Sequence, residues 1–255
     1  MLETHGLTRR YGSLVALDEV SLSVAAGARH AVIGPNGAGK STLFALVTGS
    51  LRPSAGRVVL GGQDVTRRPD HARARAGMGK TFQHSSLFTS LSLLNNVALA
   101  TQRAAGLGMA MVRPAGRHAA VQEQAMRHLE LVGLGGRAAT PAAALSHGER
   151  RQLEVALALA TSPKLLLLDE PTAGMSAADS VRFAELIESL GSAVTVLIIE
   201  HDLDVVFRLA TRVTVLHLGR VLADGTPDEV RADETVQRAY LGDAALEDLF
   251  FEGAT

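Results

Sequence analysis

Two spacings of hydrophobic residues alternate along the chain. Some stretches place apolar residues at every second position or in short unbroken runs, which is typical of strands. Others repeat leucine and valine at helical spacing. Strands are predicted over residues 2–7, 20–24, 29–33, 57–60, 165–168, 193–199, 212–218 and 220–223. Helices are predicted over residues 41–48, 91–102, 117–132, 149–161, 178–190, 203–211 and 228–240.

The order of these elements predicts an α/β fold with a mainly parallel sheet, because strands and helices alternate in the second half. The N-terminal third differs: turns at Tyr11-Gly12 and at Gly61-Gly62 join short strands and predict an antiparallel part. Residues 84–150 are rich in alanine, leucine and glutamine and are interpreted as an inserted helical subdomain. The glycine- and alanine-rich stretch at 103–118 is expected to be a surface loop.

Composition excludes several classes of protein. The chain has 255 residues and a formal net charge of −1, which gives no electrostatic reason to expect nucleic acid as a partner. It has no cysteine, so disulfides and thiolate metal sites are excluded. The first residues lack the pattern of a secretion signal. The longest uncharged stretch, residues 85–102, is too polar to span a bilayer.

The segment 34–42 fits the phosphate-binding pattern G-x-x-x-x-G-K-[ST] and stands between a predicted strand and a predicted helix. It reads Gly34, Pro35, Asn36, Gly37, Ala38, Gly39, Lys40, Ser41 and Thr42. Glycines bring backbone amides close to phosphate oxygens, and the following helix adds its N-terminal amides. In this motif the lysine reaches the β- and γ-phosphates and the serine hydroxyl binds Mg²⁺. The predicted ligand is therefore a nucleoside triphosphate with Mg²⁺.

Polar residues that suit phosphate chemistry follow the predicted central strands. Asp169 and Glu170 come directly after the run at 165–168, at the sheet edge where α/β proteins bind ligands. Asp169 is predicted to hold the Mg²⁺ shell, and Glu170 to polarise the attacking water. Gln83 can contact both metal and water through its amide. His201, after the strand at 193–199, can donate to the γ-phosphate.

A second anion site is predicted at Leu145-Ser146-His147-Gly148-Glu149, which precedes the helix at 149–161. Ser146 and Gly148 stand at a helix start, where backbone amides favour a phosphate. Two phosphate-binding helix starts far apart in one sequence suggest that two chains share each nucleotide.

These motifs together resemble the ATP-binding subunit of an ABC transporter. They occur in the order GPNGAGKST, TFQ, LSHGE, LLLLDEP and EHD, and the resemblance extends over residues 1–242. It implies one ABC-type ATP-binding domain with a P-loop NTPase core, an N-terminal antiparallel β subdomain and the helical subdomain at 84–150. Residues 243–255 are then a C-terminal extension, which either packs on its own domain or contacts a second subunit.

In this family two subunits form a head-to-tail dimer with two ATP molecules at its interface. The resemblance implies that segment 34–42 binds ATP and that Ser146 and Gly148 of the second subunit close over its γ-phosphate. Tyr11 matches the aromatic residue that stacks on adenine; the competing interpretation is a tyrosine packed in a turn.

The resemblance also assigns roles at the reacting phosphate. Glu170 corresponds to the general base, His201 to the γ-phosphate switch, and Gln83 to the sensor linked to a membrane partner. Residues 85–96, from Ser85 to Asn96, correspond to the place where the family receives the coupling helix of the membrane subunit. The chain is thus expected at the cytoplasmic face of the membrane, as a peripheral subunit bound to permease subunits.

Two departures from the family pattern stand out. The usual LSGGQ is LSHGE here, with His147 and Glu149 as the replacements. Since Ser146 and Gly148 are kept, activity is expected to be kept. Many members continue with S-A-L-D after the acidic pair, whereas this chain has Ser176 in place of that aspartate. Asp179 nearby is explained by a helix N-terminus, so the coupling between the two ATP sites is left open.

Several sequence segments resemble those of one subfamily and favour an import function. The segments TFQHSSLF, LSHGERRQLE, AGMS and GRVLADGTPDEVR resemble subunits that serve importers of branched-chain amino acids, urea or amides. In such importers the membrane subunits and a substrate-binding protein choose the solute. Two alternatives remain: the motor of a lipid or polysaccharide exporter, which shares every catalytic motif, and a non-transport ABC ATPase acting on DNA or ribosomes. The coiled-coil insertion or second ATPase domain of the latter is not seen.

Overall fold

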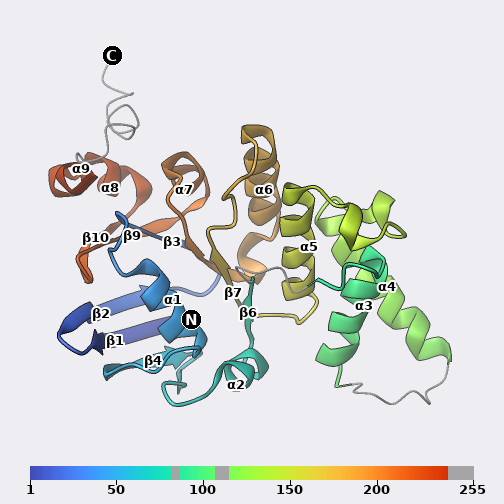
Figure 1. Ribbon diagram of the computed structural model, residues 1–255, viewed down its shortest axis with the longest axis horizontal. Coiled ribbons are helices and arrows are strands. Elements are labelled where there is room, and N and C mark those ends of the chain that lie inside the picture. The colour runs from blue at the N-terminus through green and yellow to red at the C-terminus, as the bar shows by residue number, and fades with distance from the viewer. Residues whose placement is uncertain (82–86, 107–114, 241–255) are drawn as a thin grey trace.

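Two β-sheets and the helices around them make up the computed structural model of this chain, which describes residues 1–81, 87–106 and 115–240 (Figure 1). An antiparallel sheet has the order β2-β1-β4-β5. Its strands are β1 (Leu2–Tyr11), β2 (Leu14–Val24), β4 (Ala55–Leu60) and β5 (Gln63–Asp64). The other sheet has the order β10-β9-β3-β8-β7-β6. Its strands are β3 (Arg29–Ile33), β6 (Met78–Lys80), β7 (Leu165–Asp169), β8 (Thr195–Ile199), β9 (Arg212–His217) and β10 (Arg220–Gly225).

The second sheet is parallel except for the β9–β10 hairpin. The α-helices are α1 (Lys40–Thr48), α2 (Asp70–Arg75), α3 (Leu93–Ala104), α4 (Ala115–Leu131), α5 (His147–Leu159), α6 (Ala177–Ser189), α7 (Leu203–Leu209), α8 (Pro227–Ala232) and α9 (Glu234–Tyr240). This arrangement confirms the predicted fold class: a mainly parallel core, an antiparallel N-terminal part and added helices.

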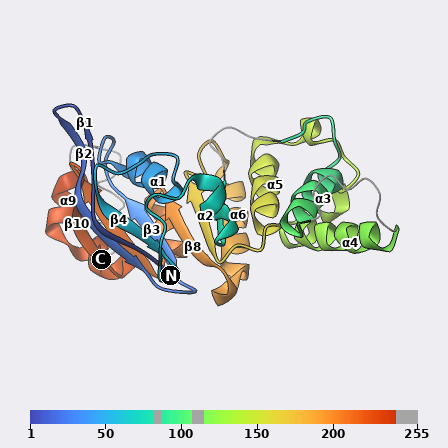
Figure 2. The same ribbon diagram turned by 90° about the horizontal axis from the view of Figure 1, so that it is seen from below.

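The central strands are buried on both faces, as their unbroken apolar runs predict. In β7, Leu165 and Leu167 join the cluster that surrounds α1, whereas Leu166 and Leu168 join the cluster formed with α5 and α6. This alternation follows from the two-residue period of a strand. Helix α1 consequently lies between the two sheets, and α5 lies on the opposite face of the parallel sheet (Figure 2).

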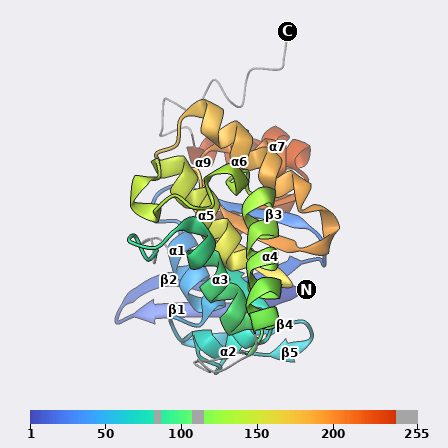
Figure 3. The same ribbon diagram turned by 90° about the vertical axis from the view of Figure 1, so that its right-hand side faces the viewer.

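Helices α3 and α4 pack side by side at one end of the molecule, and α5 lies between them and the parallel sheet (Figures 1 and 3). Leu93 and Val97 of α3 and Leu129 of α4 are fully buried in the same cluster as Leu153 of α5. The structure thus places the predicted inserted helices beside the sheet, while the exact division of the chain into a domain and an extension stays a prediction.

Several elements differ from the predicted ranges. Strand β6 is missed, because three residues after a glycine carry no pattern and the strand forms only by pairing with β7. The helix predicted at 228–240 is two helices: Asp233 ends α8 in an extended conformation, and its carboxylate accepts from the amide of Thr235 at 2.7 Å at the start of α9. Strands β1 and β2 are longer than predicted, because irregular register lets their pairing continue.

His30 places a titratable group inside the core. It is fully buried on β3, with Nε2 2.7 Å from the hydroxyl of Thr214, which in turn donates to Asp224. Burial lowers the pKa of His30 from 6.5 to about 4, and the nearby Asp224 carboxylate opposes this shift only in part. The imidazole is therefore neutral in the folded protein at neutral pH.

We expect the folded protein to lose stability in acid through His30. The unfolded chain takes up this proton near pH 6.5 and the folded chain only near pH 4, so the contribution is present above pH 6.5 and lost as the pH falls toward 4. The loss amounts to about 3 kcal/mol of unfolding free energy. Urea denaturation of His30→Gln should show a smaller loss than wild type between pH 7 and pH 4. The exposed His71→Gln is the control; equal losses in all three proteins would contradict the expectation.

Candidate functional site

The segment 34–42 forms the loop between β3 and α1, and its shape depends on glycine. Gly34 and Gly39 have φ angles of 152° and 103°, which other residues rarely adopt. A Cβ on Gly34 would lie 2.2 Å from the carbonyl oxygen of Leu216, and one on Gly39 would lie 2.7 Å from that of Ala16. The loop is therefore wedged against neighbouring backbone, which holds its amides in place.

Lys40 is the first residue of α1 and lies almost wholly inside the loop, with 7% of its surface exposed. Its ammonium donates to the carbonyl oxygens of Gly34 and Pro35, the latter at 3.1 Å. Burial lowers the pKa of Lys40, while the carboxylates of Glu170 and Asp169 oppose that shift. No side chain caps this helix start. The loop thus combines a cation with free amide donors, which suits a polyphosphate.

The acidic pair stands at the carboxyl end of β7, beside the loop, as predicted. Asp169 is the last residue of the strand and only 5% exposed. Glu170 has an unusual positive φ of 43° and donates its backbone N–H to Ile199 of the neighbouring strand at 2.8 Å. Its side chain is 44% exposed. The two carboxylates differ in access: one is enclosed beside Lys40, the other reaches water.

His201 follows β8 and lies next to Glu170, with Nδ1 4.0 Å from the Glu170 carboxylate. Glu200 holds both loops together. This carboxylate is fully buried and accepts from the backbone and hydroxyl of Thr172 on one oxygen and from the His201 and Asp202 amides on the other. The loops after β7 and β8 are therefore joined by one buried acid. Sequence reasoning missed this role, although an acid at the end of an apolar strand was the available signal.

Ser146 and Gly148 lie at the start of α5 and not beside the loop at 34–42. The Ser146 hydroxyl accepts from the amide of Glu149, whose carboxylate accepts from the Ser146 amide at 2.9 Å in a reciprocal capping box. Burial opposes ionisation of Glu149, but hydrogen bonds from Arg137 and Ser146 outweigh it and lower the pKa of this carboxyl. Because α1 and α5 pack on opposite faces of the sheet, the two helix starts do not share one phosphate within a chain.

The structure does not test the predicted nucleotide contacts of Tyr11 and Gln83. Tyr11 ends β1 with 46% of its surface exposed, and the guanidinium of Arg9 lies 4.5 Å from its ring centroid. Whether its ring stacks on adenine stays a prediction. Gln83 lies outside the described residues, as do Ser85 and Ser86 and the extension at 243–255.

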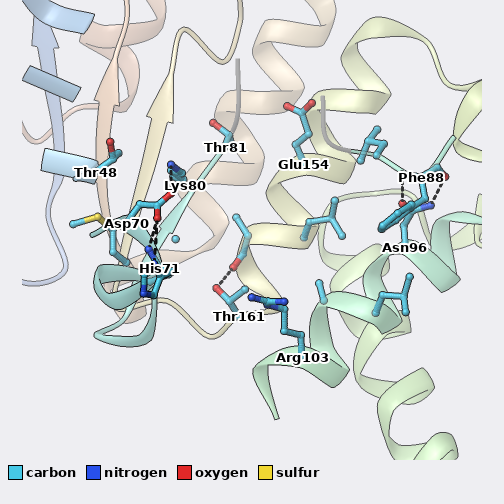
Figure 4. Close-up of a pocket in the computed structure, with 18 residues that line it drawn as sticks. Thr48, Asp70, His71, Lys80, Thr81, Phe88, Asn96, Arg103, Glu154 and Thr161 are labelled. Carbon is cyan, nitrogen blue, oxygen red and sulfur yellow. Dashed lines mark hydrogen bonds and ion pairs between the residues drawn. The ribbon is translucent and has the colours of Figure 1, made fainter. Parts of the chain in front are cut away.

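A largely apolar groove of about 480 Å³ lies between α2 and β6 on one side and α3 and α5 on the other (Figure 4). Leu87 and Phe88, which belong to the predicted docking stretch 85–96, form part of its walls. Polar residues also line it. The labelled polar residues are Thr48, Asp70, His71, Lys80, Thr81, Asn96, Arg103, Glu154 and Thr161. Asn96 is buried, and its amide binds both backbone groups of Phe88, which fixes that wall.

Two side chains connect the phosphate loop and the helix that follows it to distant parts of the chain, and the sequence motifs did not indicate either. Tyr240 of α9 is buried, which raises the pKa of its phenol, and it makes a hydrogen bond to the backbone of Gly34. Arg73 of α2 is 1% exposed and donates to the carbonyls of Leu46 and Val47 at the end of α1, at 2.7 and 2.6 Å. It also donates to Arg68 and Thr66, so every nitrogen of the guanidinium has an acceptor.

The residues present also suit Mg²⁺. Ser41 stands in the first turn of α1 and the enclosed Asp169 lies near Lys40, so a hydroxyl and a carboxylate oxygen are offered at the same edge. Hard oxygen ligands of this kind are what Mg²⁺ binds beside phosphates. Among the described residues no cluster of three or more His, Asp or Glu could hold a metal by itself.

Comparison with known proteins gives consistent matches. The sequence pattern of the family described as "ABC transporter" matches residues 17–173, and that of the "Branched-chain amino acid ATP-binding cassette transporter" matches residues 220–245. The high-affinity branched-chain amino acid transport ATP-binding protein BraF of Pseudomonas aeruginosa is 39% identical, over 96% of this chain and 98% of its own. The lipopolysaccharide export system ATP-binding protein LptB of Acidithiobacillus ferridurans is 37% identical, over 95% and 97%.

Solved structures show the same fold. An ATP-binding cassette of an ABC transporter in its ADP conformation superposes with a TM-score of 0.83 at 29% identity, covering 95% of this chain and 99% of its own. A dimeric ATP-binding cassette in a post-hydrolysis state, bound to ADP and Pi, has a TM-score of 0.73 at 24% identity, covering 89% and 99%.

Proposed function

Since this chain belongs to the ABC transporter family and is an ATP-binding subunit with ATPase activity, we propose that it powers a membrane importer for branched-chain amino acids or a related small polar solute. The observation that carries the solute class is a pair of matches, one over 96% of the chain and one to a family pattern at residues 220–245. The expected location is the cytoplasmic face of the membrane. Among the described residues, no helix is long and apolar enough to cross a bilayer.

The proposed hydrolysis uses the geometry at the ends of β3, β7 and β8. Lys40 and the loop amides bind the β- and γ-phosphates, and Ser41 and Asp169 would hold Mg²⁺, which neutralises phosphate charge when bound. Glu170, with its exposed carboxylate, accepts the proton of the attacking water. His201, beside it, donates to the γ-phosphate. Gln83 would contact metal and water.

We propose that hydrolysis takes place in a head-to-tail dimer, either of two identical chains or with a paralogue. The start of α5, with the exposed Ser146 and the buried Gly148, lies on the face of the sheet opposite to α1, which supports a contact with a second chain. In the dimer it closes over the γ-phosphate held by the partner's loop. The ATP site within one chain is therefore half of a complete one, and Tyr11 is its proposed adenine contact.

The groove between α2 and α3 is the proposed docking site for a short helix of a permease subunit. Its lining is largely apolar, with Leu87, Phe88 and Leu99 on one side, and the charged Asp70 and Arg103 stand at its margins. An amphipathic helix that places apolar side chains into such a groove matches this pattern. A substrate-binding protein would deliver the solute to the permease and not to this chain.

Leu99→Arg is expected to disrupt docking and leave ATP hydrolysis of the isolated chain unchanged. Leu99 lines the groove and is 44% exposed, so a charge there meets the permease helix without disturbing the core. Leu131→Arg is the matched control: it is 43% exposed on α4 and outside the groove lining. Co-purification with the permease subunits measures docking, and equal recovery of both variants would contradict the proposed site.

The import function is tested by uptake in a strain that lacks the gene. We expect this strain to lose uptake of radiolabelled leucine, isoleucine or valine. The wild-type chain should restore that uptake, and Leu99→Arg should not. Uptake of urea and short amides is measured in parallel to separate the solute classes.

The second candidate function is the motor of a lipid or polysaccharide exporter, favoured by the 37% identity to the lipopolysaccharide export protein LptB. Normal amino acid uptake in the deletion strain, together with accumulation of a lipid or polysaccharide at the inner membrane, would favour this function instead. A non-transport role is favoured by no observation here, and the net charge of −1 does not indicate a nucleic acid partner.

A further inference from the structure

The side chain of His147 reaches from the start of α5 to the loop that follows Glu170. Its Nε2 lies 2.9 Å from the carbonyl oxygen of Ala173. A carbonyl only accepts, so Nε2 carries the proton and donates. His147 occupies one of the two positions at which LSHGE departs from the family's LSGGQ, and a glycine there could make no such bond.

The accepting peptide is one hydrogen-bonded turn away from the proposed base. The backbone N–H of Ala173 donates to the carbonyl oxygen of Glu170 at 3.2 Å, and that of Met175 donates to Thr172 at 3.0 Å. Ala173 therefore contacts Glu170 through its amide and His147 through its carbonyl. Because Glu170 has a strained φ of 43°, the orientation of its side chain depends on how this turn is held.

The turn at 170–175 is held from two directions. Buried Glu200 binds Thr172 from the β8 side, as described above. On the α5 side, the imidazole of His147 also lies against Gly174, where a Cβ would come within 3.5 Å of Nε2. Close packing continues at Gly148, where a Cβ would lie 3.3 Å from the carboxylate carbon of Asp179. The starts of α5 and α6 are therefore in direct contact.

Ser176 stands where many members of the family have an aspartate, and its side chain is used at the start of α6. Its hydroxyl donates to Asp179 at 2.7 Å and accepts from the Asp179 amide at 3.2 Å, so it caps α6. Both residues are engaged with each other at the helix start. The side chain of α5 that makes a hydrogen bond to this loop is that of His147.

We propose that His147 is a positioning residue for hydrolysis, which holds the loop 170–175 so that Glu170 faces the attacking water. The proposal rests on the shared ATP sites of the proposed function. In the dimer, Ser146 and Gly148 contact the ATP bound by the partner, whereas Glu170 acts on the ATP of its own chain. His147 thus links one site to the other within a single chain.

The test compares His147→Met with His147→Gln in the full-length protein. The two side chains have similar length, but only glutamine can donate to the Ala173 carbonyl. Loss of one neutral hydrogen bond predicts that kcat of His147→Met falls about three- to tenfold. The KM for ATP should stay within about twofold, because the nucleotide contacts are unchanged. His147→Gln should retain most of the wild-type kcat. A purely structural role would lower thermal stability without this difference between the two variants.

The same substitutions in a Glu170→Gln background separate this inference from the proposed function. Both double variants should still form the ATP-bound dimer, since Ser146 and Gly148 are intact. Failure of Glu170→Gln alone to dimerise with ATP overturns the shared site itself. If it dimerises, then wild-type kcat in His147→Met, equal losses in the Met and Gln variants, or loss of the trapped dimer in His147→Met each overturns the role of His147.

Discussion

Glu170→Gln is expected to bind ATP as tightly as wild type and to hydrolyse it on the order of 10² to 10⁴ times more slowly. The amide keeps the shape of the side chain but cannot take the proton of the attacking water. Since the Glu170 side chain is 44% exposed and beside His201, the exchange leaves the buried core untouched. ATP should therefore accumulate unhydrolysed and hold two chains together, which size-exclusion chromatography with and without ATP measures.

The matched control for this result is Glu185→Gln. Glu185 lies on α6 with 61% of its side chain exposed and pairs only loosely with Arg208 at 3.7 Å. It should turn over ATP at the wild-type rate and elute as wild type. Normal turnover by Glu170→Gln would refute the assignment of the base. A monomer that hydrolyses at the full rate would refute the shared site.

Lys40→Ala is expected to weaken ATP binding by about 10- to 100-fold, the equivalent of one charged hydrogen-bonding partner. The enclosed ammonium bridges the two ends of the phosphate loop and supplies its only lysine charge. Its removal costs both the contact with the phosphates and the internal bonds of the loop. Isothermal titration with ATP and Mg²⁺ measures the affinity.

Only three lysines occur in the chain, at 40, 80 and 164, so a clean comparison is available. Lys164→Ala removes the same charge from an exposed position at the start of β7, away from the carboxyl edge. It should bind ATP with wild-type affinity. Equal affinity of the Lys40→Ala protein would mean that the loop does not hold the phosphates through this side chain.

Much of the fold could be predicted because the decisive signals are local. The apolar run before Asp169 predicts a strand buried on both faces and also predicts the edge at which Asp169 appears. The phosphate loop needs glycine for reasons that lie in its own backbone angles. Gly49, the residue directly after the helix predicted over 41–48, caps α1 with a φ of 81°. In each case the residues that determine the structure are neighbours in the sequence.

The contacts that could not be predicted join segments far apart in the sequence. Tyr240 meets Gly34, and Glu200 meets Thr172, across chain distances that no spacing rule describes. His147 was identified as a departure from the family, but its partner Ala173 becomes visible only when α5 and α6 are packed. The proposed docking groove likewise combines α2 with α3 and α5, so the stretch 85–96 gave only part of its lining.

The buried Arg73 has a mechanical consequence. Helix α1 has nine residues and is about 13 Å long, a stiff rod at that length. One end begins with Lys40 inside the phosphate loop, and the other is bound by Arg73, whose helix α2 forms a wall of the proposed docking groove. We therefore expect a displacement of α2 by a partner in the proposed groove to shift α1, and with it Lys40 in the phosphate loop, because Arg73 joins the two helices. The end of α1 that carries Lys40 and the end that reaches the proposed groove at Thr48 would then move together.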